Sequence, residues 1–561
     1  MTTCFRFCSR GAAGLALGLL LASVPSRAAE EPPSGESFKE SIEVSVVNLD
    51  VYVTDKKGQP VTGLKKEDFQ VFEDGSPVEI SNFFAESRGT EPAAPAVSGG
   101  SGPAAAPERP VSQRLRLVVF VDDVNLSQAN RMRILQSTGK FLHSELKPGD
   151  EVMLVRYAQK LDIRRQFTAD LEVVDADLAE ILNLPTDIRK YQQSFNQAMN
   201  SIWAAQIGGE RGGESTRGME IENQIESWAS EEGLMVQGAL DALDSVVSWL
   251  AGVPGRKAVL YVSDGLPITP GLDLYTAYSR AARQPSITQR VSAMNAEKYD
   301  MTTRFRQITS HASRNRVAFY PIEAYGTRDS SSVGLFDSIS LEIRQAGLRF
   351  LADDTGGRAL LNATDVPGAL ARVAEDFATY YSIGYQPKRP GDEAEHKIEV
   401  KVKTRGAQVR YRQWYRDKPV SETVAEATLA VMRFGPEDNP LETKLEVIPD
   451  WKRGETLVRI KVPVSKLFLQ PNGASRQGQL RLYVVASGEG STTPVRQTKM
   501  VTVEVPEAEA GSKKEYTHEI TIPLKPGFYA LGVGIRDELA AATSYLRREL
   551  TVGAGEAAAR K

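Results

Sequence analysis

The apolar and polar positions divide the chain into a middle region where strands alternate with helices and two ends rich in strands. Residues 129–146 and 234–250 carry apolar side chains at spacings of three and four, which indicates amphipathic helices. Four apolar runs around them are typical of strands buried on both faces of a parallel sheet: 115–121, 152–157, 258–262 and 317–322. This alternation predicts a three-layer α/β domain with a mostly parallel sheet, which we assign to residues 114–387.

Two stretches of this domain are longer than a plain connection between a strand and a helix requires. Residues 172–232 hold two helical patterns around a charged, glycine-rich segment at 208–217. Residues 275–306 are rich in Arg, Gln and Ser. We interpret both stretches as helical insertions above the sheet, because α/β folds place their variable segments in such connections.

The regions outside the α/β domain alternate apolar and polar residues with a period of two, as half-buried strands do. Turn signals rich in Gly, Asp and Pro separate these strands. We therefore expect the following additional parts: a small β module at 41–86, a Pro/Ala/Gly linker at 87–113, a β-hairpin extension at 388–416, a connector at 417–439, an immunoglobulin-like β-sandwich at 440–553 and a tail at 554–561.

The first residues have the pattern of an export signal. Two arginines precede the apolar stretch 11–24, and small residues follow it up to Ala28. We expect a signal peptide at 1–28, a polar leader at 29–40 and export by the general secretory route, to the periplasm or outside the cell. No membrane span is expected after cleavage. Both cysteines of the chain lie within this signal, so the mature protein would contain no disulfide and no cysteine nucleophile.

Several short motifs occur in an order that matches a known family. They are Gly63-Leu64, Glu67-Asp68-Phe69, Glu73-Asp74-Gly75, Ser263-Asp264-Gly265 and Tyr380-Tyr381-Ser382-Ile383-Gly384-Tyr385. In these motifs the chain resembles the bacterial VWFA-related domain family of the acidobacterial type, over about residues 42–416. The resemblance implies a von Willebrand factor A-like (vWA) domain, which has a Rossmann-like three-layer fold and usually binds proteins.

The resemblance also implies a site for a divalent cation at the carboxyl ends of the strands. Its usual ligands are Asp-x-Ser-x-Ser after the first strand, a Thr in a second loop and an Asp in a third. With Asp123 as the first ligand, Asn125 and Ser127 fall at the hydroxyl positions, and Asp264 supplies the third-loop carboxylate. Such oxygen ligands suit Mg²⁺, or Mn²⁺.

A second register begins with Asp122 and is slightly favoured by the position at which the strand ends. With Asp122 as the first ligand, the two hydroxyl positions become Val124 and Leu126, and the metal-ion-dependent adhesion site is degenerate. No threonine precedes the helix at 234–250 closely, and the nearest one, Thr216, lies in the glycine-rich segment. The sequence alone leaves both registers open.

Signals for catalysis are weak. The chain lacks the sequence patterns of a zinc-protease helix, a serine-hydrolase elbow and a phosphate-binding loop. The acidic pairs Asp353-Asp354 and Glu375-Asp376 keep a secreted hydrolase open as an alternative. A net charge of −4 does not favour nucleic acid as a partner. We therefore expect a non-enzymatic binding or adhesion module whose partner is a protein or a cell-envelope component.

Overall fold

The computed structural model describes residues 46–87, 114–158, 160–185, 188–207, 216–281, 295–323, 335–389, 392, 394–416, 418–435, 438–450, 452–488, 494–509, 511–512 and 514–553. The expected signal peptide and polar leader lie outside these residues, as do nearly all of the 87–113 linker and the 554–561 tail. Within the described residues, no helix has both the length and the apolar character needed to cross a bilayer.

A five-stranded sheet forms the centre of the α/β domain. Its strands are β5 (Leu115–Asp122), β6 (Glu151–Ala158), β7 (Lys160–Thr168), β8 (Arg256–Val262) and β9 (Val317–Ile322). They lie in the order β7-β6-β5-β8-β9. Strands β6, β5, β8 and β9 are parallel, and β7 is antiparallel at the edge. The first strand of this domain, β5, is therefore central, as in doubly wound α/β folds, and the predicted mostly parallel sheet is confirmed.

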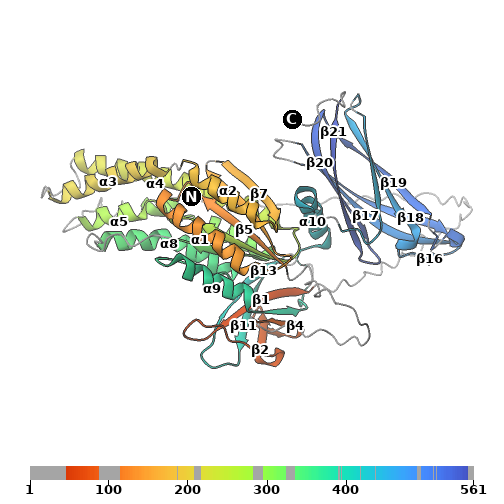
Figure 1. Cartoon of the computed structure of the whole chain (residues 1–561), viewed down its shortest axis with the longest axis horizontal. Coiled ribbons are helices and arrows are strands. Elements are labelled where there is room, and N and C mark those ends of the chain that lie inside the picture. The colour runs from red at the N-terminus through yellow and green to blue at the C-terminus, as the bar shows by residue number, and fades with distance from the viewer. Residues whose placement is uncertain are drawn as a thin grey trace, which may run out of the picture. The chain divides into compact units, whose positions relative to one another are not determined.

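Helices cover both faces of this sheet (Figure 1). One face packs against α1 (Gln128–Glu145), α2 (Leu171–Asn183) and α9 (Val366–Ala378). The other packs against α4 (Thr216–Leu250), α7 (Thr302–Arg314) and α8 (Leu335–Thr355). All eight residues of β5 are buried, because this central strand is covered on both sides.

The insertions form a smaller hydrophobic core of their own. Helix α3 (Ile188–Ile207), the first half of α4 and α5 (Leu272–Ala281) contribute most of it, and the short helix η3 (Ala296–Tyr299) adds Ala296. The two helical patterns predicted around 220–229 and 234–250 are one continuous helix of 35 residues, α4. Its second half packs on the sheet and its first half packs against α3 and α5, so one helix joins the main core to the insertion core.

Strands from before and after the α/β domain combine into a single β domain. The strands that precede it are β1 (Val47–Thr54), β2 (Phe69–Glu73), β3 (Ser76–Val78) and β4 (Ile80–Glu86), with the short helix η1 (Lys66–Asp68). Those that follow it are β10 (Tyr380–Tyr385), β11 (Glu395–Val402), β12 (Gln408–Arg410) and β13 (Trp414–Arg416). The two sheets have the orders β12-β1-β10-β4 and β13-β11-β2-β3 and share one core.

The sequence pattern predicts these strands as three separate parts: a β module at 41–86, the end of the α/β domain and a hairpin at 388–416. In the structure β10 pairs with both β1 and β4, and β11 pairs with β2. The tyrosines of β10 explain this arrangement, because Tyr381 packs on Phe69 and Phe83 and its hydroxyl donates to Val61 O at 2.7 Å. Pairing over more than 300 residues leaves no local pattern in the sequence.

The C-terminal part consists of one helix and two antiparallel sheets around one apolar core. Its elements are α10 (Val420–Phe434), β14 (Lys444–Asp450), β15 (Glu455–Pro463), η4 (Val464–Lys466), β16 (Gln470–Asn472), β17 (Ser475–Gly488), β18 (Val495–Pro506), η5 (Glu507–Glu509), β19 (Glu515–Pro523), β20 (Gly527–Asp537) and β21 (Thr543–Val552). Helix α10 falls in the expected 417–439 connector. It packs on β20 where Gly532 and Gly534 leave room for Met432 and Thr428.

Candidate functional site

Three adjacent parallel strands each end in a buried carboxylic acid. Asp122 is the last residue of β5, Asp264 follows β8 by two residues, and Glu323 follows β9 directly. Their exposed fractions are 0%, 5% and 0%. The carboxyl ends of parallel strands meet at one edge of the sheet, so we call this set of three acids and the loops around them the carboxyl edge.

The Asp122 carboxylate is surrounded by neutral donors. The Tyr261 hydroxyl donates to it at 2.6 Å, the Ser263 hydroxyl at 3.1 Å and the Asn125 side-chain amide at 3.0 Å. Burial raises the pKa of Asp122, and these hydrogen bonds oppose that rise. Burial and the neighbouring Asp122 raise the pKa of Tyr261 well above its usual value, which keeps the phenol as the donor.

Asp264 occupies the N-terminus of α1. Its carboxylate accepts from Ser127 N at 2.8 Å and from Asn130 Nδ2 at 2.7 Å. The Ser127 hydroxyl accepts from Asn130 N at 3.4 Å and is the N-cap of the helix. Asp264 N donates to Asn125 O at 2.8 Å, which ties this loop to the one after β5. A carboxylate at a helix N-terminus is favoured by the helix dipole, while burial raises the pKa of Asp264.

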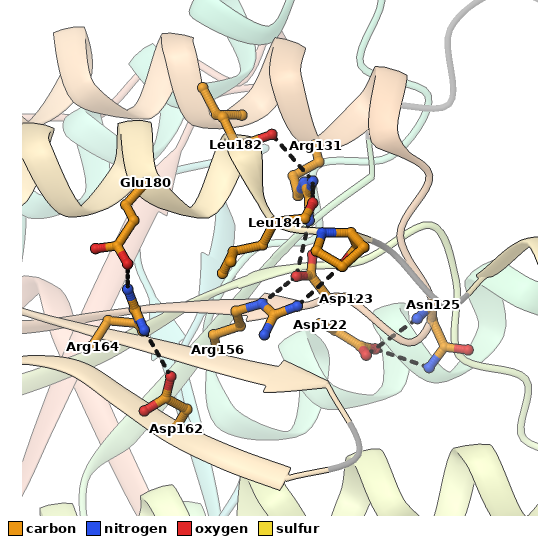
Figure 2. A network of polar contacts seen from close by, with 11 residues as sticks. Asp122, Asp123, Asn125, Arg131, Arg156, Asp162, Arg164, Glu180, Leu182 and Leu184 are labelled. Carbon is orange, nitrogen blue, oxygen red and sulfur yellow. Dashed lines mark hydrogen bonds and ion pairs between the residues drawn. The ribbon is translucent and has the colours of Figure 1, made fainter.

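Asp123 points away from this cluster (Figure 2). It accepts from Arg131 Nη1 at 3.0 Å and from Arg156 Nε at 2.5 Å, and all three side chains are largely or fully buried. Arg131 also donates to Leu182 O at 3.3 Å, at the end of α2. Asp122 ends β5 and Asp123 begins the turn that follows, and the two carboxylates bind different donors, so they do not serve the same site.

The structure therefore brings together Asp122, Asn125, Ser127 and Asp264 and leaves Asp123 apart. Of the predicted set Asp123, Asn125, Ser127 and Asp264, Asp123 alone lies apart, and the alternative register begins with Asp122. In that register the two hydroxyl positions are Val124 and Leu126, with exposed fractions of 5% and 0%. Leu126 belongs to the main core and Val124 to the core of the insertions.

These residues do not fit a divalent cation. The hydroxyl ligand positions carry apolar side chains, and Asp122 and Asp264 already accept hydrogen bonds from protein donors. A cation could be coordinated by these carboxylates only if it displaced the donors that they already bind. Across the described part of the chain, no three His, Cys, Asp or Glu side chains are grouped so that they could hold a metal ion. The carboxyl edge thus has the location of an adhesion site but not its ligands.

Two acids and an arginine at this edge were not predicted from the sequence: Glu323, Glu232 and Arg344. Burial raises the pKa of both Glu323 and Glu232 to about 7, and Arg344 opposes the rise in each case. Glu323 accepts from Gln345 Nε2 at 2.6 Å, and Glu232 accepts from Gly271 N at 2.7 Å and lies 3.7 Å from Arg344 Nη2. The position of Glu323 directly after an apolar strand was a usable signal, while Glu232 and Arg344 come from helices and had none.

The loop after β8 is fixed tightly on α8. Leu266 N donates to Arg344 O at 2.7 Å, and Gly347 N donates to Leu266 O at 3.1 Å. Gly265 has a φ of +144°, and a Cβ there would lie 2.8 Å from Arg344 Cβ. A side chain at this position is therefore excluded by both the backbone conformation and the neighbouring helix. The carboxyl edge is closed on this side.

In the acidic pairs considered for a hydrolase, Asp376 and Asp354 are each bonded to donors from other elements of the fold. Arg410 Nη2 binds both oxygens of Asp376 at 2.6 Å, and Arg358 Nη2 binds one at 2.9 Å. Asp354 accepts from the Thr309 hydroxyl at 2.9 Å. These acids serve contacts between elements of the fold.

The fold defines the chain's central part as a doubly wound α/β domain. No family model matches the chain, and no curated protein matches it. Similar solved structures include an aerotolerance-related membrane protein from Bacteroides fragilis, with 9% identity, a TM-score of 0.23 and coverage of 47% of this chain and 98% of that one. Proximal thread matrix protein 1 from the mussel byssus has 10% identity, a TM-score of 0.20 and coverage of 48% of each chain. The ArnB paralog VWA2 from Sulfolobus acidocaldarius has 10% identity, a TM-score of 0.18 and coverage of 91% and 75%.

Proposed function

We propose that this chain is an exported, non-catalytic binding protein of the vWA type, and that it binds its partner without a metal ion. The strand order around a central first strand supports the vWA type, as do the family motifs. The observation that carries the proposal is the closed carboxyl edge. Its carboxylates are bonded to protein donors, and Val124 lies in the core of the insertion helices.

The insertion helices offer a surface for a partner in place of that edge. Trp203 near the end of α3 is 42% exposed, Met219 near the start of α4 is 56% exposed, and Leu234 further along α4 is 70% exposed. Exposed Trp and Met are enriched at protein interfaces. We call Trp203 and Met219, which flank the connection between α3 and α4, the insertion patch, and its partner would be a protein or a cell-envelope component.

Metal independence is tested by thermal unfolding of the chain without its signal peptide, in Mg²⁺, Mn²⁺, Ca²⁺ and EDTA. A cation at about 100 times its dissociation constant stabilises a fold by roughly 2.7 kcal/mol. We expect equal melting temperatures in all four buffers. A saturable rise with Mg²⁺ or Mn²⁺ that disappears in Asp264→Ala would contradict metal independence.

The surface is tested by retention of envelope components on the immobilised chain, using the double variant Trp203→Ala, Met219→Ala. We expect the variant to lose what the wild type retains, because burial of large apolar side chains dominates most interfaces. Met500→Ala is the matched control, since Met500 is 45% exposed on β18 of the C-terminal part. Equal retention by all three proteins would exclude the insertion patch as the binding surface.

A further inference from the structure

A second polar cluster lies at the opposite end of the sheet, where β5, β8 and β9 begin. A cavity of about 40 Å³ is lined there by Leu115, Lys257 and Val317 at the starts of these strands, and by Asn48, Asp50 and Tyr52 of β1. Four cationic side chains border the cavity, but Asp50 is the only carboxylate that does: the cations are Arg256, Lys257, Arg316 and Arg412. We call these residues the amino-end cavity.

One of the four cations is well compensated. Arg256 donates to Asp50 Oδ2 at 3.3 Å, to the Tyr52 hydroxyl at 3.0 Å and to Phe377 O at 3.4 Å. Its guanidinium also stacks on the Tyr380 ring, 3.6 Å from the ring centroid. Asp50 thus serves Arg256 through one oxygen, while the other, Oδ1, is buried without a hydrogen-bond partner among the described residues.

Of the other three cations, two donate to main-chain carbonyls, and the third has no side-chain hydrogen bond with the described residues. Lys257 donates to Val253 O at 2.9 Å, and Arg412 donates to Asn48 O at 2.9 Å and to Ser313 O. Arg412 Nε is buried without a partner, and the Arg316 side chain forms no hydrogen bond or ion pair with any residue that the structure describes. A carbonyl dipole does not neutralise a full positive charge, so this cluster lacks negative charge.

The charges act on one another strongly. Burial, together with the nearby charges of Arg316, Lys418 and Arg412, lowers the pKa of Lys257 to about 7, and Glu426 opposes this shift. Glu426 itself is paired with Lys418 and so is only partly available as a counter-charge. Burial, together with Arg316, lowers the pKa of Arg412 to about 10. A bound anion would remove this mutual repulsion.

We propose that the amino-end cavity binds a small tetrahedral oxyanion, phosphate or sulfate. The cavity has the volume of a few water molecules, which matches one such ion. Arg316 and the free Nε of Arg412 supply charge-assisted donors, and Lys257 supplies the third charge. An ion held here would join β1 of the β domain to the beginnings of β8 and β9. This inference does not depend on the proposed function.

The test is a titration of the chain with inorganic phosphate and with sodium sulfate at constant ionic strength, followed by calorimetry and by thermal unfolding. We expect saturable binding of either ion and a rise in melting temperature of roughly 3–5 °C near saturation, with no effect of chloride. Calorimetry on the wild type alone decides whether an oxyanion binds, whatever the variants do. No saturable heat with phosphate or with sulfate would overturn the proposal.

The site is located with Arg316→Asn. Arg316 has a φ of 57°, and asparagine tolerates this left-handed conformation, so the variant removes the guanidinium without new backbone strain. We expect its affinity for phosphate to fall roughly tenfold or more. The control is Arg405→Asn, at an exposed turn of the β domain, with wild-type affinity. Unchanged affinity in Arg316→Asn, or an equal and non-saturating stabilisation of all three proteins by salt exclusion, would overturn the proposal.

Discussion

Charged side chains are buried at both ends of the central sheet, but the groups that they bind differ. At the carboxyl edge, Asp122 and Asp264 each accept hydrogen bonds from several neutral donors supplied by nearby loops. At the amino-end cavity, Lys257 and Arg412 have main-chain carbonyls, and Arg316 has no partner in the described structure. Asp122 and Asp264 are thus bonded to donors of the chain itself, although Glu323 Oε1 at the same edge is buried without a partner among the described residues. At the amino end, three cations border a cavity to which Asp50 alone of the described residues brings a carboxylate. A ligand is therefore expected at the amino end rather than where related folds place it.

The largest loss of stability is expected when two buried arginines beside the carboxyl edge lose their carboxylate. They would then resemble the cations of the amino end. Asp123→Ala leaves Arg131 and Arg156 without their carboxylate, and Asp123 and Arg131 are both fully buried. Breaking a buried ion pair from one side costs about 3–5 kcal/mol. Urea unfolding should show a loss of this size. Asp162→Ala, which removes one exposed partner of Arg164 (Figure 2), should cost less than about 1 kcal/mol. Equal losses in both variants would show that burial does not separate the two pairs.

Lys257 tests the amino end by its pH dependence. Its pKa is lowered to about 7 from an unfolded value of 10.5, so the cost of burying the ammonium is fully present below pH 7 and is relieved as pH rises towards 10.5. Without phosphate, wild-type stability should rise by on the order of 3 kcal/mol between pH 7 and pH 9.5. Lys257→Met should lose this rise, as measured by urea unfolding at both pH values. Lys403→Met, at an exposed position, should keep it. A rise of the same size in Lys257→Met would place its origin elsewhere.

Glu323, at the carboxyl edge, should give a pH dependence of stability opposite in sign to that of Lys257. Its pKa is raised to about 7 from 4.5, so the folded state holds a proton that the unfolded state releases, and stability falls as pH rises from 4.5 to 7. Glu323→Gln should remove about 2–3 kcal/mol of the fall between pH 5 and pH 7. Glu342→Gln on the exposed side of α8 is the control. If both variants follow the wild-type pH profile, Glu323 is not protonated in the folded chain.

The sequence predicted the α/β domain well, because strands buried on both faces, such as β5, are apolar throughout and the helices have clear spacing. It placed Asp123, Asn125, Ser127 and Asp264 near one another, with Asp122 as the alternative first residue, since each follows a strand or precedes a helix. The orientation of Asp123 was not predictable, because a shift of one residue at the end of a strand reverses a side chain's direction. The amino-end cavity was not predictable either. Its cations come from β8, the turn after α7 and the segment between β12 and β13, and only tertiary structure brings them together.

Substitution of Ser127 should give the smallest loss of stability. It distinguishes a role as a metal ligand from a role as a helix cap. As a metal ligand, as the sequence first suggested, its hydroxyl would matter only when a cation is bound. In the structure it caps α1, with its hydroxyl accepting from Asn130 N. Ser127→Ala should therefore cost about 1 kcal/mol in urea unfolding, equally in Mg²⁺ and in EDTA. Ser127→Asp keeps a capping oxygen but adds a charge beside Asp264, so it should restore less stability than a cap alone would give. A cost of Ser127→Ala that appears only in Mg²⁺ would return Ser127 to the list of metal ligands and reopen the carboxyl edge as a cation site.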